Sequence, residues 1–156
     1  MELYEGVYKD LYRFAYWYLG GNSHDAEDVV SEAVLKAYEN FSSLRREESF
    51  RAWIFQILVN QCRHHLRRRK SCETVELKDE PFYLPTLDDR TMTIQLLEGL
   101  SEEERAIVAL TVFGGYKGEE IARIMNRRHS TIRSKYRRAL KKLEKQLEAE
   151  VSEVRR

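Results

Sequence analysis

The sequence predicts an all-α protein made of two small helical domains joined by a flexible acidic linker. Three observations lead to this prediction. Apolar residues recur at intervals of three and four along most of the 156 residues, which is the spacing of one face of an α-helix. Charged residues make up 34% of the chain, against seven glycines and two prolines, a composition that favours helices. The periodicity fails in one stretch near the middle, and both prolines lie there.

The first helix is expected to end at Gly20 and Gly21. Its apolar residues recur at every fourth position from Leu3 to Leu19, which places them on one face. The two glycines follow directly, and glycine ends helices because it adopts the left-handed cap conformation at little cost.

Two further helices are expected before residue 70. Ser23 or Asp25 is placed to cap the second helix through its side-chain oxygen. A polar stretch then interrupts the periodicity, and a third long helix follows. The residues expected to face the core are Ala26, Val29, Val30, Ala33, Val34, Ala37 and Tyr38 in the second helix, and Phe50, Trp53, Ile54, Ile57, Leu58 and Leu66 in the third.

Residues 71–91 are predicted to form the linker. This segment is acidic and contains both prolines of the chain, which is typical of a connection between domains. It separates a domain of residues 1–70 from a domain of residues 92–150. The second domain is expected to contain four shorter helices, over 94–99, 101–113, 119–125 and from residue 130 onward.

The formal net charge of +1 conceals strong segregation of charge along the chain. Residues 25–40 carry five acids and one lysine, and residues 73–104 carry ten acids and two cations. Residues 45–70 carry eight cations and two acids, and residues 117–145 carry eleven cations and three acids. Such blocks of opposite sign on a nearly neutral chain indicate distinct binding surfaces.

The basic segment near the C-terminus has the layout of a helix-turn-helix. A short helix precedes Asn126, which can adopt the left-handed conformation that ends a helix. Ser130 or Thr131 is placed to cap the next helix. Such a helix docks its first turns in the major groove of DNA, where arginine binds guanine edges. The inward stripe is Ile132, Tyr136, Ala139, Leu140, Leu143 and Leu147, and the outer and flanking residues are Thr131, Arg133, Ser134, Lys135, Arg137, Arg138, Lys141 and Lys142.

Each charged surface, taken alone, also fits a solvated helix face. The short helix, turn and cap before the basic C-terminal helix favour DNA binding over that alternative. The third helix carries aromatic residues followed by "RRRK". These residues fit a surface on which unpaired bases stack and cations hold the backbone. The alternative for "RRRK" is that it only places a favourable positive charge at the C-terminus of the helix. The acidic face of the second helix could bind a basic partner, or it could simply be exposed to solvent.

No catalytic residue, metal site or cofactor is expected. Cys62 and His65 form one ligand pair, whereas a zinc site needs four ligands, usually in spaced pairs. Cys62 and Cys72 are too few for a disulfide framework.

No apolar run approaches the roughly 18 residues of a membrane span, and the first residues are unlike a signal peptide. We therefore expect a cytoplasmic protein without membrane insertion.

Both halves of the chain resemble one known family. "HDAEDVVSEAVLKAYENF", followed by "SFRAWIFQILVNQCRHHLRRR", resembles region 2 of the extracytoplasmic function (ECF) group of sigma-70 factors. "LSEEERAIVALTVFGGYKGEEIARIMNRRHSTIRSKYRRALKKL" resembles their region 4. The two matches stand in the order and spacing of the family. The resemblance implies an alternative sigma factor that binds core RNA polymerase and directs promoter recognition, melting and initiation.

The resemblance also implies partners and site residues. The implied partners are the clamp and flap regions of core RNA polymerase, promoter DNA and an anti-sigma factor. The polar loop over 40–49 is implied to hold a flipped base of the −10 element. The implied residues are Asp25, Asp28, Glu32 and Leu35 for the polymerase, Asn60, Arg63, His64 and Arg67 for the −10 element, and Thr131, Arg133, Ser134, Arg137 and Arg138 for the −35 element.

Some positions depart from the family pattern, and an alternative function remains open. Ser101 stands where the family usually has proline and is still expected to cap a helix, whereas Lys117 stands at a usual serine cap and caps more weakly. Asn126 and Ser130 stand where glycines are common. The alternative is a stand-alone helix-turn-helix regulator that binds duplex DNA as a dimer, at half-sites about one helical turn apart.

Overall fold

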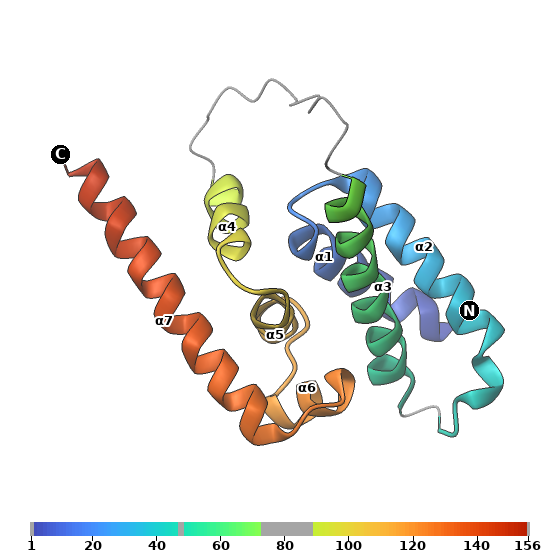
Figure 1. Ribbon diagram of the computed structural model, residues 1–156. Coiled ribbons are helices and arrows are strands. Elements are labelled where there is room, and N and C mark those ends of the chain that lie inside the picture. Colours follow the sequence, from blue (N-terminus) through green and yellow to red (C-terminus); the bar gives the residue numbers. More distant parts are fainter. Residues whose placement is uncertain (1, 47–48, 73–88, 156) are drawn as a thin grey trace.

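The structure, a computed structural model, describes residues 2–46, 49–72 and 89–155 and contains no strand among them (Figure 1). The all-α prediction is therefore confirmed. The helices are α1 (Glu2–Tyr18), α2 (Ser23–Glu39), the short 3₁₀ helix η1 (Phe41–Ser43), α3 (Phe50–Cys72), α4 (Asp89–Glu98), α5 (Glu102–Val112), α6 (Gly118–Met125) and α7 (His129–Val154).

The predicted linker coincides only in part with described residues. Helix α3 extends through Cys72, and α4 begins at Asp89. Residues 73–88, which include both prolines, lie outside the described residues. The flexible linker and the domain boundaries of the sequence analysis therefore stay predictions.

The cap residue of helix α2 lies earlier than either expected cap, by one residue relative to Ser23 and by three relative to Asp25. Gly20 and Gly21 adopt φ angles of 82° and 80° and end α1, as expected. Asn22 is left in an extended conformation, and its Oδ1 accepts a hydrogen bond of 3.1 Å from the backbone N–H of Asp25. The expected cap at Ser23 or Asp25 is therefore wrong, because the glycine turn places Asn22 three residues before that N–H.

The stripe expected for α2 is largely buried, with one error. Ala33 and Ala37 are buried on the face toward α1 and α3, but Tyr38 is 83% exposed. Tyr38 lies one turn after Leu35, which is 59% exposed, so it shares the outer side of the helix with Leu35 rather than the buried face. The expected inward position of Tyr38 is wrong.

The helix ends of the C-terminal half follow their local chemistry. Ser101 caps α5, because its Oγ accepts a hydrogen bond of 3.3 Å from the N–H of Glu104, as expected. Lys117 at the start of α6 makes no side-chain cap bond, which confirms the weaker cap. Asn126 ends α6 in the left-handed conformation, at φ 52° and ψ 51°, also as expected.

The cap expected for α7 is wrong. The residue at the cap position is Arg128, which is extended and makes no side-chain cap bond. Ser130 already lies inside the helix, where its carbonyl accepts a hydrogen bond of 3.0 Å from Ser134 Oγ. The left-handed turn at Asn126 reverses the chain early enough for helical geometry to begin at His129.

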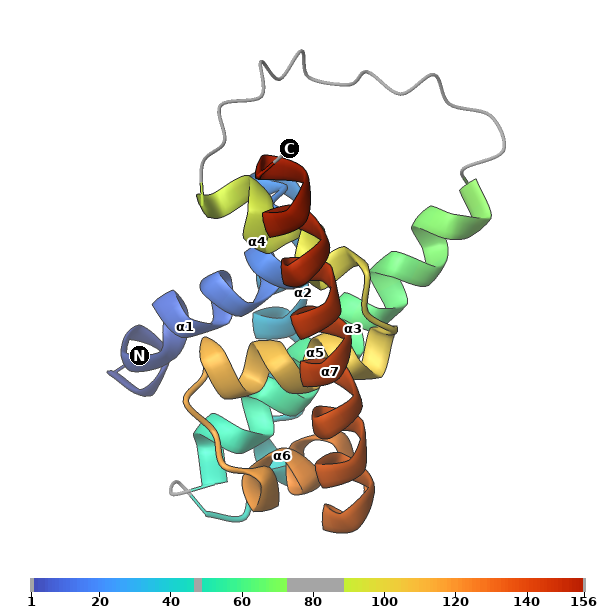
Figure 2. The same ribbon diagram turned by 90° about the vertical axis from the view of Figure 1, so that its left-hand side faces the viewer.

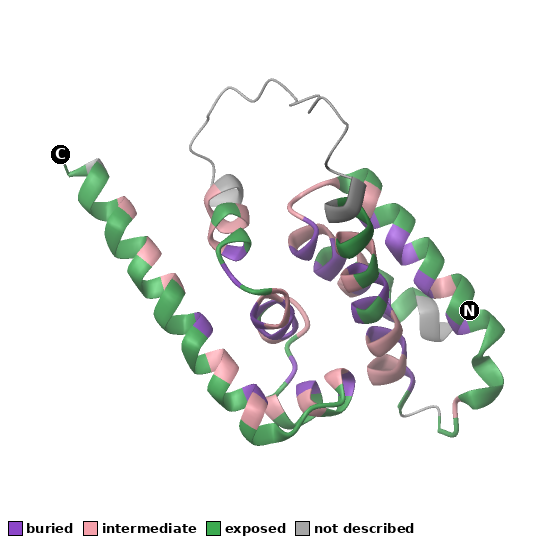
Figure 3. Ribbon diagram, in the orientation of Figure 1, coloured by how far each residue is buried: buried purple, intermediate pink, exposed green. Residues whose placement is uncertain are grey.

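The buried residues of α7 lie in its first half, and Leu143, one turn further, packs against a second cluster that contains Leu97 and Leu100. Ile132 and Ala139 are buried and Tyr136 is half-buried against the core, whereas Leu140 and Leu147 are 45% and 39% exposed. The 26 residues of α7 span about 39 Å, and the 11 residues of its neighbour α5 span about 16 Å. The expected inward stripe is therefore wrong at Leu140, which turns away from the face that carries Ala139, and at Leu147. Leu147 lies in the last turns of α7, which are mostly exposed (Figure 3).

The N-terminal and C-terminal halves pack against each other. Helix α1 contacts α5, and α3 contacts α6 (Figures 1 and 2). The rings of Trp17 and Phe113 stack with centroids 5.2 Å apart, and Phe55 meets Tyr116 edge-on at 5.2 Å. Stacked and edge-on aromatic pairs stabilise such a contact beyond their area. One continuous apolar core therefore spans both halves.

Two arginines add polar contacts across the same boundary. Arg51 of α3 donates hydrogen bonds of 2.9 Å to the Tyr116 hydroxyl and 3.3 Å to the Gly114 carbonyl. Burial raises the pKa of Tyr116 to about 12, so its hydroxyl remains a neutral acceptor. Arg105 of α5 donates a bond of 3.2 Å to the carbonyl of Tyr18 in α1.

We expect Ser101→Ala to lower the free energy of unfolding by about 1 kcal/mol, because the N–H of Glu104 loses its cap acceptor. Urea denaturation of both proteins measures this change. Ser31→Ala, at an exposed position inside α2, is the matched control and should not destabilise the protein. Equal stability of Ser101→Ala and wild type would contradict the cap.

Candidate DNA-binding and partner-binding surfaces

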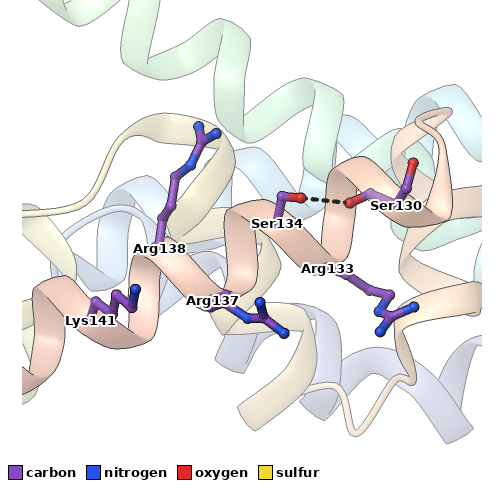
Figure 4. Close-up of a pocket in the computed structure, with 6 residues that line it drawn as sticks. All are labelled: Ser130, Arg133, Ser134, Arg137, Arg138 and Lys141. Carbon is purple, nitrogen blue, oxygen red and sulfur yellow. Dashed lines mark hydrogen bonds between the residues drawn. The ribbon is translucent and has the colours of Figure 1, made fainter.

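A strip of basic and hydroxyl side chains runs along one face of α7. Members of the strip follow one another at helical spacings of three and four residues, so they share a face. In Figure 4, Arg133 and Arg137 extend to one side of the helix and Arg138 to the other. The strip forms a shallow groove lined by Ser130, Arg133, Ser134, Arg137, Arg138 and Lys141; we call it the basic face.

The start of α7 adds a further site for anions. The Arg128 side chain does not cap the helix, so the first backbone N–H groups lack a side-chain acceptor. A helix N-terminus carries partial positive charge and suits a phosphate group. The basic face and this end of α7 together fit a polyanion with regularly spaced phosphates.

Four of the five residues predicted for the −35 element lie on the basic face. Thr131 is half-buried and lies outside the residues that line the groove. Ser130, which was expected to cap the helix, lines the groove instead. The spacing of Ser130 from Ser134 and Arg137, at four and seven residues, could have placed it there from the sequence.

Two cations beside the basic face are paired with one acid. Glu103 of α5 accepts a hydrogen bond of 2.6 Å from Arg127 Nη2 and another from Lys135 Nζ. These hydrogen bonds, from Lys135 first, outweigh burial and lower the pKa of Glu103 below its usual value. The carboxylate is therefore ionised at neutral pH.

The residues predicted for the −10 element lie along one face of α3, but they differ in exposure. Asn60, His64 and Arg67 are exposed. Arg63 is half-buried and turned toward α5, with its Nη2 3.8 Å from Glu103 Oε1. Arg63 is therefore not presented to solvent as the other three are.

An aromatic pair lies next to this face, beside the loop over 40–49. Phe41 is 52% exposed and meets Trp53 edge-on, with ring centroids 6.4 Å apart. Exposed aromatic rings can stack on unpaired bases. Residues 47–48 of the loop lie outside the described residues.

The acids predicted to bind polymerase divide into two groups. Asp25 is largely covered, because its Oδ2 lies 3.1 Å from Arg69 Nη1 and 3.5 Å from His65 Nε2 of α3. Asp28 and Glu32 are exposed, although Glu32 lies 3.6 Å from Arg68 Nη2. Asp25 therefore joins α2 to α3, while the next turns of α2 face outward.

An exposed stripe continues along α2 beyond these acids. Leu35 is 59% exposed, and Tyr38, one turn further, is 83% exposed. With Asp28 and Glu32 they follow one another at helical spacings of three and four residues, so they share one face. Tyr38 was missed as a surface residue, although its spacing from Leu35 could have indicated it. We call Asp28, Glu32, Leu35 and Tyr38 the α2 stripe.

The described residues contain no group of three or more histidine, cysteine, aspartate or glutamate side chains placed to hold a metal ion. Cys62 is fully buried and reduced, and burial raises the pKa of its thiol. Within the same described residues, no helix has the length and apolar character required to cross a membrane.

Comparison with known families matches both halves. Residues 3–72 match Sigma-70 region 2, and residues 90–143 match Sigma-70 region 4. RNA polymerase sigma factor SigV of Bacillus subtilis is 31% identical over 145 residues, which cover 91% of this chain and 87% of SigV. The chain belongs to the ECF group of the sigma-70 family. ECF RNA polymerase sigma-E factor of Escherichia coli K12 is 30% identical over 135 residues, covering 75% of this sigma factor and 71% of that one.

Two solved structures resemble the whole fold. The sigma factor RpoE of Bartonella quintana, in complex with the anti-sigma factor NepR, matches with a TM-score of 0.75 and 26% identity over 93% of this chain and 94% of that one. CnrH, in complex with the cytosolic domain of CnrY, matches with a TM-score of 0.74 at 23% identity, over 95% of this chain and 86% of that one. The likeness in fold therefore extends over both halves of this ECF sigma factor.

Proposed function

We propose that this sigma factor docks on core RNA polymerase through the α2 stripe and reads its promoters through α3 and α7. The observation that carries the proposal is the basic face of α7, presented by a helix-turn-helix in the same chain as an acidic α2 and a cationic α3. Each surface has the charge its proposed partner requires. The nucleotide chemistry belongs to the polymerase, so this chain needs no catalytic residue, and it acts in the cytoplasm with the polymerase.

Reading of the −35 element is assigned to the first turns of α7. The major groove of B-DNA admits an α-helix, and the basic face is presented on the uncovered side of α7. Arg133 and Arg137 extend to one side together, where each could bind a guanine edge through two hydrogen bonds. Ser130 and Lys141 would contact phosphate, and binding would therefore weaken as salt concentration rises.

Reading of the −10 element is assigned to the exposed face of α3 and its aromatic neighbours. Unstacking DNA costs on average about 1.4 kcal/mol per base step. Capture of an unpaired base on an aromatic ring stabilises the open strand by roughly 1–3 kcal/mol. Phe41 and Trp53 could therefore offset the opening of a few base pairs, while His64 and Arg67 bind the adjoining backbone.

Docking on the polymerase is assigned to the α2 stripe rather than to Asp25. Leu35 and Tyr38 form an exposed apolar centre with Asp28 and Glu32 beside it. Apolar anchors surrounded by polar residues are typical of protein interfaces. Asp25 would act indirectly, by holding α2 against α3 through Arg69.

An anti-sigma factor is proposed as a further partner. The similar RpoE structure contains the anti-sigma factor NepR, and this chain matches that sigma factor over both halves. Such a partner would cover the proposed DNA-binding surfaces. Unchanged affinity for DNA and for core polymerase in the presence of a candidate partner would contradict this assignment.

The test is transcription from genomic promoter fragments by purified core polymerase, with and without this chain. We expect defined start sites only when the chain is present, and weak binding of duplex DNA by the chain alone. Tight binding of a palindromic duplex by a dimer of the chain, without any start site, would instead identify the stand-alone regulator.

We expect Leu35→Glu to weaken binding to core polymerase at least tenfold, because it removes the proposed apolar anchor of the α2 stripe. Fluorescence anisotropy with labelled sigma factor measures the affinity. Val151→Glu, an equivalent change at a residue 48% exposed near the end of α7, should leave the affinity within about twofold. Equal losses in both variants would show that α2 is not the docking surface.

A further inference from the structure

Two neighbouring acids of α5 bind two lysines of α7. Glu103 and Glu104 lie in the first turn of α5, and their side chains are 13% and 9% exposed. Glu103 Oε2 accepts a hydrogen bond from Lys135 Nζ, and Glu104 Oε1 accepts one of 2.7 Å from Lys142 Nζ. We call Glu103 and Glu104 the acid pair.

The two ion pairs hold α7 at separate points. Successive residues of a helix point about 100° apart, so the two carboxylates reach different turns of α7. Lys135 and Lys142 are two turns apart in the chain, which places them on one face of α7 and about 10 Å apart along its axis. A single attachment would leave α7 free to swing about it, whereas two attachments determine both its direction and its rotation.

Both members of the acid pair are ionised when they bind the lysines. Hydrogen bonds, from Lys135 first, lower the pKa of Glu103. Burial acts to raise the pKa of Glu104, but hydrogen bonds from Lys142 and Ser101 outweigh it, and the pKa lies below its usual value. Hydrogen bonds between charged groups are about twice as strong as those between neutral groups, so each carboxylate holds its lysine firmly.

The acid pair is better suited to orientation than to stability. A largely buried ion pair stabilises a fold little, because the desolvation of its charges offsets their attraction. Glu104 Oε2 is also buried without a hydrogen-bond partner among the described residues, which is destabilising. The apolar contacts of α7 at Ile132 and Ala139 are non-directional. The ion pairs add the directional contacts that apolar packing lacks.

The two attachments flank the segment that reads DNA under the proposed function. Arg137 and Arg138 of the basic face lie between the two lysines in the chain, and Arg133 lies two residues before the first lysine. Side-chain ends lie about 5–6 Å from the axis of a helix, so a rotation of about 10° displaces them by about 1 Å. Hydrogen-bond lengths vary by only about 0.5 Å, so this displacement is enough to break a bidentate contact with a base.

We propose that the acid pair positions α7 for recognition of the −35 element, because its bonds to Lys135 and Lys142 set the rotation of the helix and thereby the bases that the basic face reads. Neither acid contacts DNA, so both are positioning residues. The inference rests on the proposed assignment of α7 to the −35 element. It places determinants of promoter specificity on α5, outside the helix that enters the groove.

The test compares transcription from two promoters by core polymerase with this chain, at limiting sigma factor. One promoter carries the cognate −35 element, and the other carries a scrambled −35 element with the −10 element unchanged. The ratio of the two run-off signals is the −35 discrimination. Unfolding of part of the sigma factor lowers both signals in the same proportion, so the ratio does not report stability.

We expect Glu103→Gln and Glu104→Gln each to lower the −35 discrimination on the order of tenfold, which corresponds to the loss of one well-placed base contact. Both substitutions keep the shape of the side chain and remove its charge. Glu144→Gln is the matched control, because it removes the same charge at an exposed position of α7. It should leave the discrimination within about twofold of wild type.

Variants of Lys142 test whether Glu104 acts through its ion pair. Lys142→Met should lower the discrimination as Glu104→Gln does, and the double variant should lose no more than the more affected single variant, because both changes break one pair. Lys142→Arg keeps a cation opposite Glu104 and should retain most of the discrimination.

Two results would overturn the positioning role. They are equal discrimination by Glu104→Gln and Glu144→Gln, and a proportional loss of both signals in the acid-pair variants, which would show that the acids only stabilise the fold. A wild-type chain that does not distinguish the two promoters would instead contradict the proposed function. Discrimination by wild type that the acid-pair variants retain contradicts only the positioning role.

Discussion

Arg133→Ala is expected to lower transcription from promoters with the cognate −35 element by roughly tenfold to a hundredfold. A bidentate contact between arginine and guanine contributes about 1–3 kcal/mol of discrimination. Arg133 lies in the first turns of α7 and lines the basic face, where an inserted helix meets base edges. Run-off transcription with purified core polymerase measures the effect.

Two comparisons separate base reading from other causes of this loss. Lys145→Ala removes one positive charge further along α7, outside the residues that line the basic face, and should lower transcription no more than about twofold. Affinity of Arg133→Ala for core polymerase should equal that of wild type. Loss of polymerase binding, or an equal loss on promoters without the −35 element, would mean that Arg133 belongs to another surface.

Phe14→Ala is expected to lower the free energy of unfolding by about 3–5 kcal/mol. Phe14 is fully buried, stacks on Tyr18 with centroids 5.5 Å apart and meets Phe55 edge-on at 6.2 Å. Its removal leaves a cavity where α1 packs against α3. Since domains are stable by only about 5–15 kcal/mol, this single change removes a large fraction of the stability.

The matched control for Phe14→Ala is another aromatic truncation on the surface. Tyr38→Ala, at a residue 83% exposed, should change the free energy of unfolding by less than about 0.5 kcal/mol. Urea denaturation followed by circular dichroism measures both variants. A loss below about 1 kcal/mol for Phe14→Ala would show that this aromatic cluster is not packed in solution.

Local features of the fold were predictable from the sequence, because neighbouring residues determine them. The glycine pair ends α1, Ser101 caps α5 and Asn126 is left-handed, each as expected. The expected caps of α2 and α7 were wrong, because the preceding turns shift the start of each helix. The position of each cap depends on the residue at which the preceding turn ends.

Burial was predictable only where a neighbouring helix covers the apolar face. The spacing that places Ile132 and Ala139 in the core also includes Leu140 and Leu147. Periodicity does not show that Leu140 turns away from the face that carries Ala139, or that the last turns of α7, with Leu147, are mostly exposed. The expected burial of Tyr38 was wrong for a related reason: apolar character alone does not show which side of a helix packs against a neighbouring helix.

The candidate surfaces could be placed on particular helices from the sequence, but the ion pairs that their side chains form were not predictable. Helical spacing is enough to place Arg133 and Arg137 on one outer face. It does not show that Asp25 binds Arg69 of another helix, or that Arg63 turns toward Glu103. Such pairs join residues far apart in the chain, and charge along the sequence indicates only that partners of opposite sign exist.

The sequence by itself determined the helical class, the charged surfaces and the resemblance of both halves to sigma-70 factors, because these depend on local spacing and residue type. Only the tertiary structure decided that the halves close on one another. Arg51 and Tyr116 meet across a separation of 65 residues, and Trp17 stacks on Phe113. A contact of this kind depends on the shapes of two folded surfaces, which no local pattern contains.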